Sequence, residues 1–206
     1  MNSLDGIRVL DLSRVLAGPW CTQNLADLGA DVLKVERPGQ GDDTRRWGPP
    51  YLKDAQGRES NESAYYLSTN RNKRSVVLDL KLPEDIAALN KLCESADILI
   101  QNLRPGVVDE IGIGPEAMLA RHPRLIYCSI TGFGQTGPYA HRAGYDFIIQ
   151  GMSGFMSVTG EPDGQPMKAG VAIADIFTGM YAVVAIQAAL HHARETGRGQ
   201  HVDMAL

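Results

Sequence analysis

The chain has 206 residues and a formal net charge of −4 at pH 7. Apolar residues make up 44% and charged residues 21%, the balance of a soluble globular protein, and the length suits one large domain or most of one. The acidic balance argues against a nucleic-acid-binding protein, which carries a basic surface. We find neither an uninterrupted apolar window of membrane-spanning length nor a signal peptide. We therefore expect a cytoplasmic protein without nucleic-acid or membrane partners.

The three cysteines, Cys21, Cys93 and Cys128, are widely spaced and lie in apolar surroundings. An odd number with such spacing does not suit a disulfide framework or a zinc site. We expect reduced cysteines in the core. The five histidines form no pattern typical of metal ligands, so no metal site is predicted.

Apolar strand-like runs alternate with helix-like segments along the chain. We expect strands over residues 7–12, 31–36, 75–80, 97–101 and 125–130, with a further strand starting at residue 201. Helices are expected from Pro19 to Gly29, over 115–121 and over 180–192. Another is expected to start at Pro83, with an apolar stripe formed by Ile86, Leu89, Leu92 and Cys93. A polar loop rich in Gly and Pro is expected over 37–50, followed by an acidic and polar stretch to Glu62. This alternation predicts an α/β protein with a Rossmann-like open parallel sheet and helices on both faces.

The first strand–helix–strand unit invites comparison with dinucleotide-binding proteins. Glu36 ends the second strand, at about the distance after the first strand where an acid would hold a ribose. The loop before Pro19 carries only Gly18, however, where the phosphate-binding fingerprint requires three glycines. A backbone cradle for pyrophosphate is therefore unsupported, and we do not expect NAD.

Asp175 lies between a strand-like apolar run, residues 168–174, and the helix expected over 180–192, which stops at Gly197. Taken alone, an Asp at the start of a helix is most often an N-cap whose side chain bonds the free amides of the first turn. Burial would raise its pKa, whereas a helix N-terminus would lower it.

Six motifs, in order, resemble the class III CoA-transferases, the group of formyl-CoA transferase, carnitine CoA-transferase and methylacyl-CoA racemase. The motifs cover residues 4–19, 28–42, 69–75, 101–106, 131–146 and 168–179, and the resemblance extends over residues 4–206. It implies the N-terminal part of an interlocked-dimer fold, in which residues 1–206 form a large Rossmann-like CoA-binding domain. Relatives are longer, and the chain stops where a strand begins, so we expect an N-terminal fragment.

The resemblance also implies site residues. Asp175 would be the nucleophile, and the expected CoA contacts are Leu16, Ala17, Arg37, Asn70, Arg71, Asn72, Lys73, Asn102, Leu103, Arg104, Arg142, Ala143, Gly144 and Tyr145. The physical properties of several agree. A small residue such as Ala17 lets a ligand approach the backbone, and a guanidinium such as that of Arg37 can bind a phosphate through two donors. The chain departs from some relatives at Glu110, where they carry Arg, and Arg104 is the alternative contact.

The implied activity transfers CoA from an acyl-CoA thioester to a free carboxylic acid, without a permanently bound cofactor. The carboxylate would attack the thioester and pass through a mixed anhydride and an aspartyl-CoA thioester. The racemase branch uses a His where this chain has Tyr145, and a phenol is a poor base near neutral pH, so transferase is favoured. Alternatives are an acyl-CoA racemase and a non-catalytic CoA-binding fragment.

The substrate is expected to be a small dicarboxylic acid, because the segments 42–50 and 143–146 are most similar to the succinate–hydroxymethylglutarate branch. Arg45, Arg46 or Trp47 would meet a distal carboxylate, with a rim salt bridge or a packed aromatic residue as the equal alternative. The resemblance further implies that the full-length protein is a homodimer.

Overall fold

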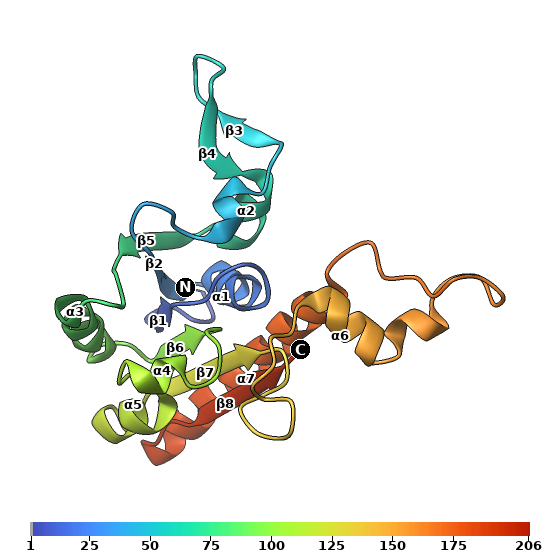
Figure 1. Ribbon diagram of the computed structural model, residues 1–206. Coiled ribbons are helices and arrows are strands. Elements are labelled where there is room, and N and C mark those ends of the chain that lie inside the picture. Colours follow the sequence, from blue (N-terminus) through green and yellow to red (C-terminus); the bar gives the residue numbers. More distant parts are fainter. Residues whose placement is uncertain (1) are drawn as a thin grey trace.

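The computed structural model describes residues 2–206, apart from the side chain of Asn61, and it shows an α/β fold (Figure 1). Six parallel strands form one sheet in the order β5-β2-β1-β6-β7-β8. Their bounds are Arg8–Asp11 (β1), Asp31–Glu36 (β2), Lys73–Val77 (β5), Ile98–Gln101 (β6), Ile126–Thr131 (β7) and His201–Ala205 (β8). The prediction of a parallel α/β sheet is confirmed.

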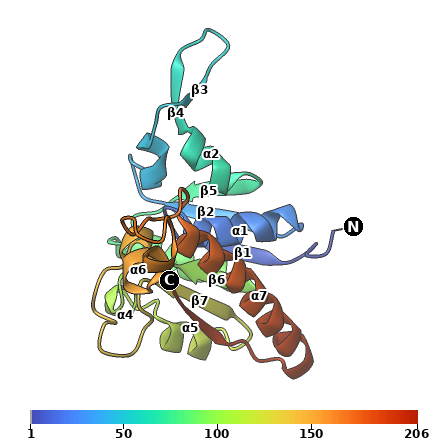
Figure 2. The ribbon, with the colours of Figure 1, turned by 90° about the vertical axis from the view of Figure 1, so that its right-hand side faces the viewer.

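Helices cover both faces of this sheet (Figure 2). One face packs against α1 (Ala17–Asp27) and α7 (Ile173–Thr196). The other face packs against α3 (Pro83–Cys93), α4 (Val107–Glu110) and α5 (Pro115–Arg121). Successive strand residues serve opposite cores: Ile98 and Ile100 of β6 face α1 and α7, whereas Leu99 faces the other side. Strands buried on both faces have continuous apolar sequences, which explains why the sequence revealed them.

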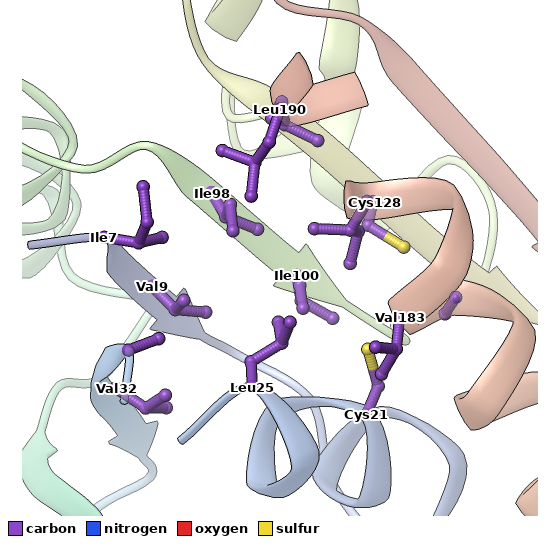
Figure 3. Close-up of a cluster of buried hydrophobic side chains, with 14 of the residues drawn as sticks. Ile7, Val9, Cys21, Leu25, Val32, Ile98, Ile100, Cys128, Val183 and Leu190 are labelled. Carbon is purple, nitrogen blue, oxygen red and sulfur yellow. The ribbon is translucent and has the colours of Figure 1, made fainter. Parts of the chain in front are cut away.

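The core between α1, α7 and the sheet is shown in Figure 3. Cys21 and Leu25 of α1 point toward Ile100, and Val183 of α7 lies close by. Cys21, Cys93 and Cys128 are all buried and unpaired, so the prediction of reduced core cysteines is confirmed. Gly179 lets the two helices approach closely, since a Cβ built there would lie 2.6 Å from the carbonyl oxygen of Ala17.

A second group of elements lies outside the main sheet. A short antiparallel hairpin, β3 (Tyr51–Lys53) and β4 (Glu59–Ser63), projects from the body, as Figure 1 shows. The 3₁₀ turn η1 (Asp43–Arg46) precedes it and α2 (Ala64–Asn70) follows it. Beyond β7 come α6 (Asp146–Met152) and the 3₁₀ turn η2 (Phe155–Val158). The loop expected over 37–50 contains the 3₁₀ turn η1, and the polar stretch after it, for which no element was predicted, contains the two short strands.

Some predicted bounds also differ from the structure. Strand β2 and helix α5 have the predicted residues, but β5 begins at Lys73, two positions before the prediction. Helix α7 begins at Ile173 and not at Met180, and residues 168–172 form no strand. The start of α7 is held by a side chain from another helix, as described below, and local sequence does not reveal such a contact.

Within residues 2–206, α7 alone is long and apolar enough to cross a membrane by length and composition. This differs from our expectation that no window reaches that length. The core helix of a soluble protein meets the same criterion, and Ala182, Ile186 and Leu190 of α7 are buried against the sheet and α1.

Gly179→Ala should destabilise the fold. The added methyl group would meet the Ala17 carbonyl oxygen at 2.6 Å and Trp20 Cδ1 at 3.0 Å, and backbone cannot move aside cheaply. Overpacking of this kind costs about 1–3 kcal/mol, which exceeds the gain in helix propensity from Gly to Ala. Denaturant unfolding measures the loss. Gly170→Ala is the matched control, since a Cβ there meets nothing within 4 Å. Equal stability of the two variants would contradict the close contact.

Candidate active site

A cavity of about 350 Å³ opens at the carboxyl ends of the central strands. Its wall comes from the loops that follow β1 (14–17), β6 (102–105) and β7 (131–132), from the segment 142–145, and from Asp175. The chain runs from β1 outward to β2 and later returns to the other side of β1 with β6. Such a reversal leaves a crevice between the diverging loops, which is where open α/β sheets bind ligands.

Asp175 is the third residue of α7, so it does not cap the helix. The N-cap position is Ala172, whose side chain has no polar atom. The first turn is held by Asp146 of α6: its Oδ1 accepts hydrogen bonds from the backbone N–H groups of Ala174 (2.7 Å) and Asp175 (3.3 Å). The N-cap expectation for an isolated Asp is thus wrong here. Because Asp146 satisfies these amides, the Asp175 carboxylate is free to face the cavity.

The electrostatics of Asp175 set it apart from an ordinary surface carboxylate. Burial, together with the negative charge of Asp146, raises its pKa from 3.8 to about 6. A hydrogen bond from the backbone N–H of Ala17 opposes the rise. The carboxylate is therefore desolvated and still ionised at neutral pH, and the positive end of the helix dipole favours that charge. These are the properties of a carboxylate nucleophile.

The loop after β1 is fixed in an unusual conformation. Val15 has φ 74°, which a β-branched residue adopts only when its surroundings enforce it. The Val15 N–H donates to Asp42 Oδ1 (3.3 Å). Both main-chain groups of Arg14 bind the Asn102 side chain, with N to Oδ1 at 2.9 Å and O to Nδ2 at 2.7 Å. This clamp places Leu16 and the Ala17 amide in the cavity wall.

A close approach of two glycines shapes another part of the wall. A Cβ on Gly132 would lie 2.4 Å from the Cα of Gly144. Only residues without side chains fit at both positions, so the segment that carries Tyr145 can close against the end of β7. Arg142 lies in the same segment, where its guanidinium stacks over the ring of Tyr139 at 4.7 Å.

The structure brings most of the predicted site residues together. The cavity wall contains Leu16, Ala17, Asn102, Leu103, Arg104, Arg142, Ala143, Gly144, Tyr145 and Asp175. Asn102 also has a structural role, because both ends of its amide bond the main chain of Arg14. Glu110 is exposed at the end of α4 and does not line the cavity, whereas Arg104 does.

Arg37 follows β2 and lines a second hollow of about 400 Å³, together with Glu36, Gly39, Gln40, Gly41, Arg45, Arg46, Ser75 and Val77. Its guanidinium pairs with Asp43. Asp43 also pairs with Arg14, at 3.0 Å, in the wall of the first cavity. One carboxylate therefore bridges two cations that serve different hollows.

The run Asn70–Lys73 does not line the cavity that contains Asp175. These residues precede or begin β5, and the parallel pairing of Lys73 with Val32 places them toward the amino edge of the sheet. Arg71 and Asn72 bind Asp27 at the end of α1. The Lys73 side chain, bonded to Asn70, nevertheless reaches Asp11 at the carboxyl end of β1. The predicted CoA contacts of this run therefore stay a prediction.

Lys73 has three hydrogen-bond partners inside the fold. Its side chain is 2% exposed, and Nζ donates to Asp11 Oδ2 (3.1 Å), Pro19 O (2.9 Å) and Asn70 Oδ1 (3.0 Å). All three donors are thus used inside the fold. Burial lowers the pKa of Lys73 to about 8, against the opposing effect of Asp11.

The three residues considered for binding a distal carboxylate have different surroundings in the structure. Arg45 binds both oxygens of Glu36 at 2.7 Å and stacks 3.8 Å above the Tyr66 ring, so it is a structural residue. Trp47 packs edge-on against Tyr65. Arg46 is exposed beside the second hollow.

Sequence reasoning missed several residues of the site. Arg14, Asp43 and Thr131 line the cavity, and Asp146 holds the start of α7. Arg14 and Asp146 lay inside motifs that were recognised, and their positions after or beside predicted elements were the available signal. Asp43 lay inside the recognised segment 42–50, but its pairing with Arg14 and Arg37 could not be seen in the sequence.

Comparison with known proteins identifies the family. The sequence model described as CoA-transferase family III matches residues 4–206. The chain belongs to this family. It is 63% identical over 203 residues to the succinate–glutarate CoA-transferase of Agrobacterium fabrum and 50% identical over 206 residues to the succinyl-CoA:glutarate CoA-transferase of Mus musculus. These alignments cover 98% and 100% of the chain.

A solved structure agrees over the whole chain. The CAIB/BAIF family protein of Brucella suis is 55% identical, with a TM-score of 0.94, and the match covers 100% of this chain and 53% of the other. The chain also covers 50% and 46% of the two transferases. It therefore spans about half the length of the relatives that it matches.

Asp146→Asn should lower the pKa of Asp175 from about 6, because it removes a negative charge and keeps an oxygen that can accept the Ala174 N–H. Carboxyl titration by NMR with ¹³C-labelled aspartate measures the change, and the resonance is assigned by its loss in Asp175→Asn. Asp163→Asn, in an exposed loop, should leave the titration unchanged. A pKa of Asp175 that stays near 6 without the Asp146 charge would contradict the electrostatic coupling.

Proposed function

We propose that the full-length protein is a CoA-transferase that moves CoA between an acyl-CoA thioester and a short dicarboxylic acid. The observation that carries the proposal is the Asp175 carboxylate. It is desolvated, has a raised pKa and stands at a helix N-terminus in the wall of a cavity. Membership of CoA-transferase family III and the names of the two transferases support the same reaction and substrate class.

The reaction follows from a carboxylate nucleophile. An Asp175 oxygen attacks the thioester carbonyl and the C–S bond breaks, which leaves a mixed anhydride and CoA thiolate. The thiolate then attacks the Asp175 carbonyl carbon, releasing the first acid and forming an aspartyl-CoA thioester. The acceptor carboxylate attacks this thioester, and the two steps run in reverse. One thioester replaces another, so no net proton or electron transfer is needed.

The cavity suits these steps because it shields the intermediates. Both the anhydride and the aspartyl thioester would be lost to hydrolysis in open water. The Ala17 amide can stabilise negative charge on the Asp175 carboxyl group as the intermediates form and collapse. The chain's own backbone and one carboxylate thus provide the chemistry, and the proposal includes no permanently bound cofactor.

The arginines suit the anionic CoA ester. Arg104 and Arg142 in the first cavity, and Arg37 in the second hollow, offer guanidinium groups to phosphates. The main-chain groups of Leu103 and Gly144 are also available along the wall. Because these substrates are soluble metabolites, we propose a cytoplasmic enzyme without membrane or nucleic-acid partners.

The racemase alternative fits the site less well. It requires a second base next to the nucleophile, and the residue at that position is Tyr145, which is 65% exposed in the cavity wall. A phenol does not accept a proton readily near neutral pH. A test for exchange of the hydrogen on the carbon beside the thioester separates the two activities.

Asp175→Asn should abolish acyl exchange, with a loss of about 10⁴-fold or more, and leave the fold intact. The amide cannot form the anhydride, and the helix start is held by Asp146 in either case. The assay measures CoA transfer from succinyl-CoA to glutarate by the full-length protein. Hydroxylamine or borohydride trapping in the presence of acyl-CoA should label Asp175 in the unmodified enzyme. Full activity of the Asn variant would refute the mechanism.

We further propose that the full-length protein is a homodimer. Large apolar side chains are exposed around α6 and the start of α7, including Phe147 (59%), Phe177 (56%) and Tyr181 (64%). Exposed apolar surface of this kind is typical of an interface and promotes aggregation when uncovered.

Light scattering should accordingly report a dimer for the full-length protein, whereas residues 1–206 expressed alone should aggregate or bind hydrophobic dyes. Strands β5 and β8 at the two ends of the sheet add unpaired edges to the isolated domain. A monodisperse monomer of residues 1–206 that melts cooperatively would contradict this prediction.

A further inference from the structure

The cavity that contains Asp175 has three guanidinium groups in its wall, from Arg14, Arg104 and Arg142. The only carboxylates in the same wall are Asp43 and Asp175. Cations therefore outnumber anions among the described residues of this cavity. Arg104 and Arg142 are exposed, whereas the side chain of Arg14 is 35% exposed.

Arg14 differs from the other two in how firmly it is held. Asn102 binds both its N–H and its carbonyl oxygen, and the next residue, Val15, is fixed with φ 74° by Asp42. A second contact, from Nη1 to Asp43 Oδ2 at 3.0 Å, orients the guanidinium. Arg14 is thus preorganised before any ligand arrives, which lowers the entropy lost on binding.

The Arg14 guanidinium also keeps unused donors. It has five N–H groups, and Asp43 is its one side-chain partner among residues 2–206. A second carboxylate can therefore bind the remaining edge of the fork through two parallel hydrogen bonds. Neither Arg45, which is committed to Glu36, nor Arg46, which lines the other hollow, has this combination of position and free donors.

Arg14 lies near the reacting atoms. Ala17 and Asp175 line the same cavity as Arg14, and Arg14 precedes Ala17 by three residues, which span at most about 11 Å. We propose that Arg14 binds the distal carboxylate of a short aliphatic dicarboxylate while Asp175 reacts at its other end. This inference rests on the proposed CoA-transferase function and names the residue that selects its substrates.

The test compares two acceptors of equal chain length in the full-length protein, glutarate and pentanoate, with one CoA donor. In a double-displacement mechanism, kcat/KM for the acceptor reports only the acceptor half of the reaction. Arg14→Gln should lower kcat/KM for glutarate by about 10- to 100-fold and leave that for pentanoate unchanged, because only glutarate loses a charged hydrogen-bond pair. Arg14→Lys, which keeps the charge but not the fork, should give an intermediate loss.

Arg46→Gln is the matched control and should preserve the glutarate preference. The unchanged pentanoate rate shows that the Arg14 variants remain folded. Equal losses of kcat/KM for both acceptors in Arg14→Gln would overturn the inference, because they indicate a structural role. An unchanged preference for glutarate in Arg14→Gln would also overturn it, as would loss of that preference in Arg46→Gln. If the wild-type enzyme had equal kcat/KM values for pentanoate and glutarate, the role of Arg14 would be overturned and the proposed function would stand. A wild-type protein that transfers CoA to neither acid would overturn the proposed function as well.

Discussion

The site depends on four buried charges beneath the loop that follows β1. Asp11 pairs with Lys73 at 3.1 Å and Lys34 pairs with Asp42 at 2.9 Å, and all four side chains are at most 2% exposed. The two lysines and the hydroxyls of Ser13 and Thr22 hold the pKa of Asp11 at about 2, although burial alone would raise it. Removing one partner would leave an uncompensated buried charge, which is strongly destabilising. The cluster therefore supports the loop after β1, which forms part of the cavity wall.

The fold was largely predictable because its sheet is parallel and buried. Strands such as β6 and β7 appear as apolar runs, and α5 is marked by a proline at its start. The parallel topology brings residues that follow β1, β6 and β7 to one cavity, and the resemblance had named several of them. The start of α7 was not predictable, since the Asp146 carboxylate that caps it lies 28 positions before Ala174.

Several polar side chains of the site have structural partners that the sequence does not reveal. A cation in a sequence looks available, but whether it is depends on its partners in the fold. Lys73 pairs with a carboxylate 62 positions away, and Arg45 with one 9 positions away. Asn102 lines the cavity and also holds another loop. Motif resemblance pointed to residues that share one cavity, whereas the structural partners of each side chain required the three-dimensional contacts.

The raised pKa of Asp175 has a consequence for the stability of the fold at neutral pH. An acid that titrates at 3.8 in the unfolded chain and at about 6 in the fold stabilises the folded protein less and less as pH rises between these values. Above pH 6 its ionisation costs the fold on the order of 2–3 kcal/mol. The carboxylate at this position therefore lowers the free energy of unfolding at neutral pH, and an uncharged residue of the same shape would not carry that cost.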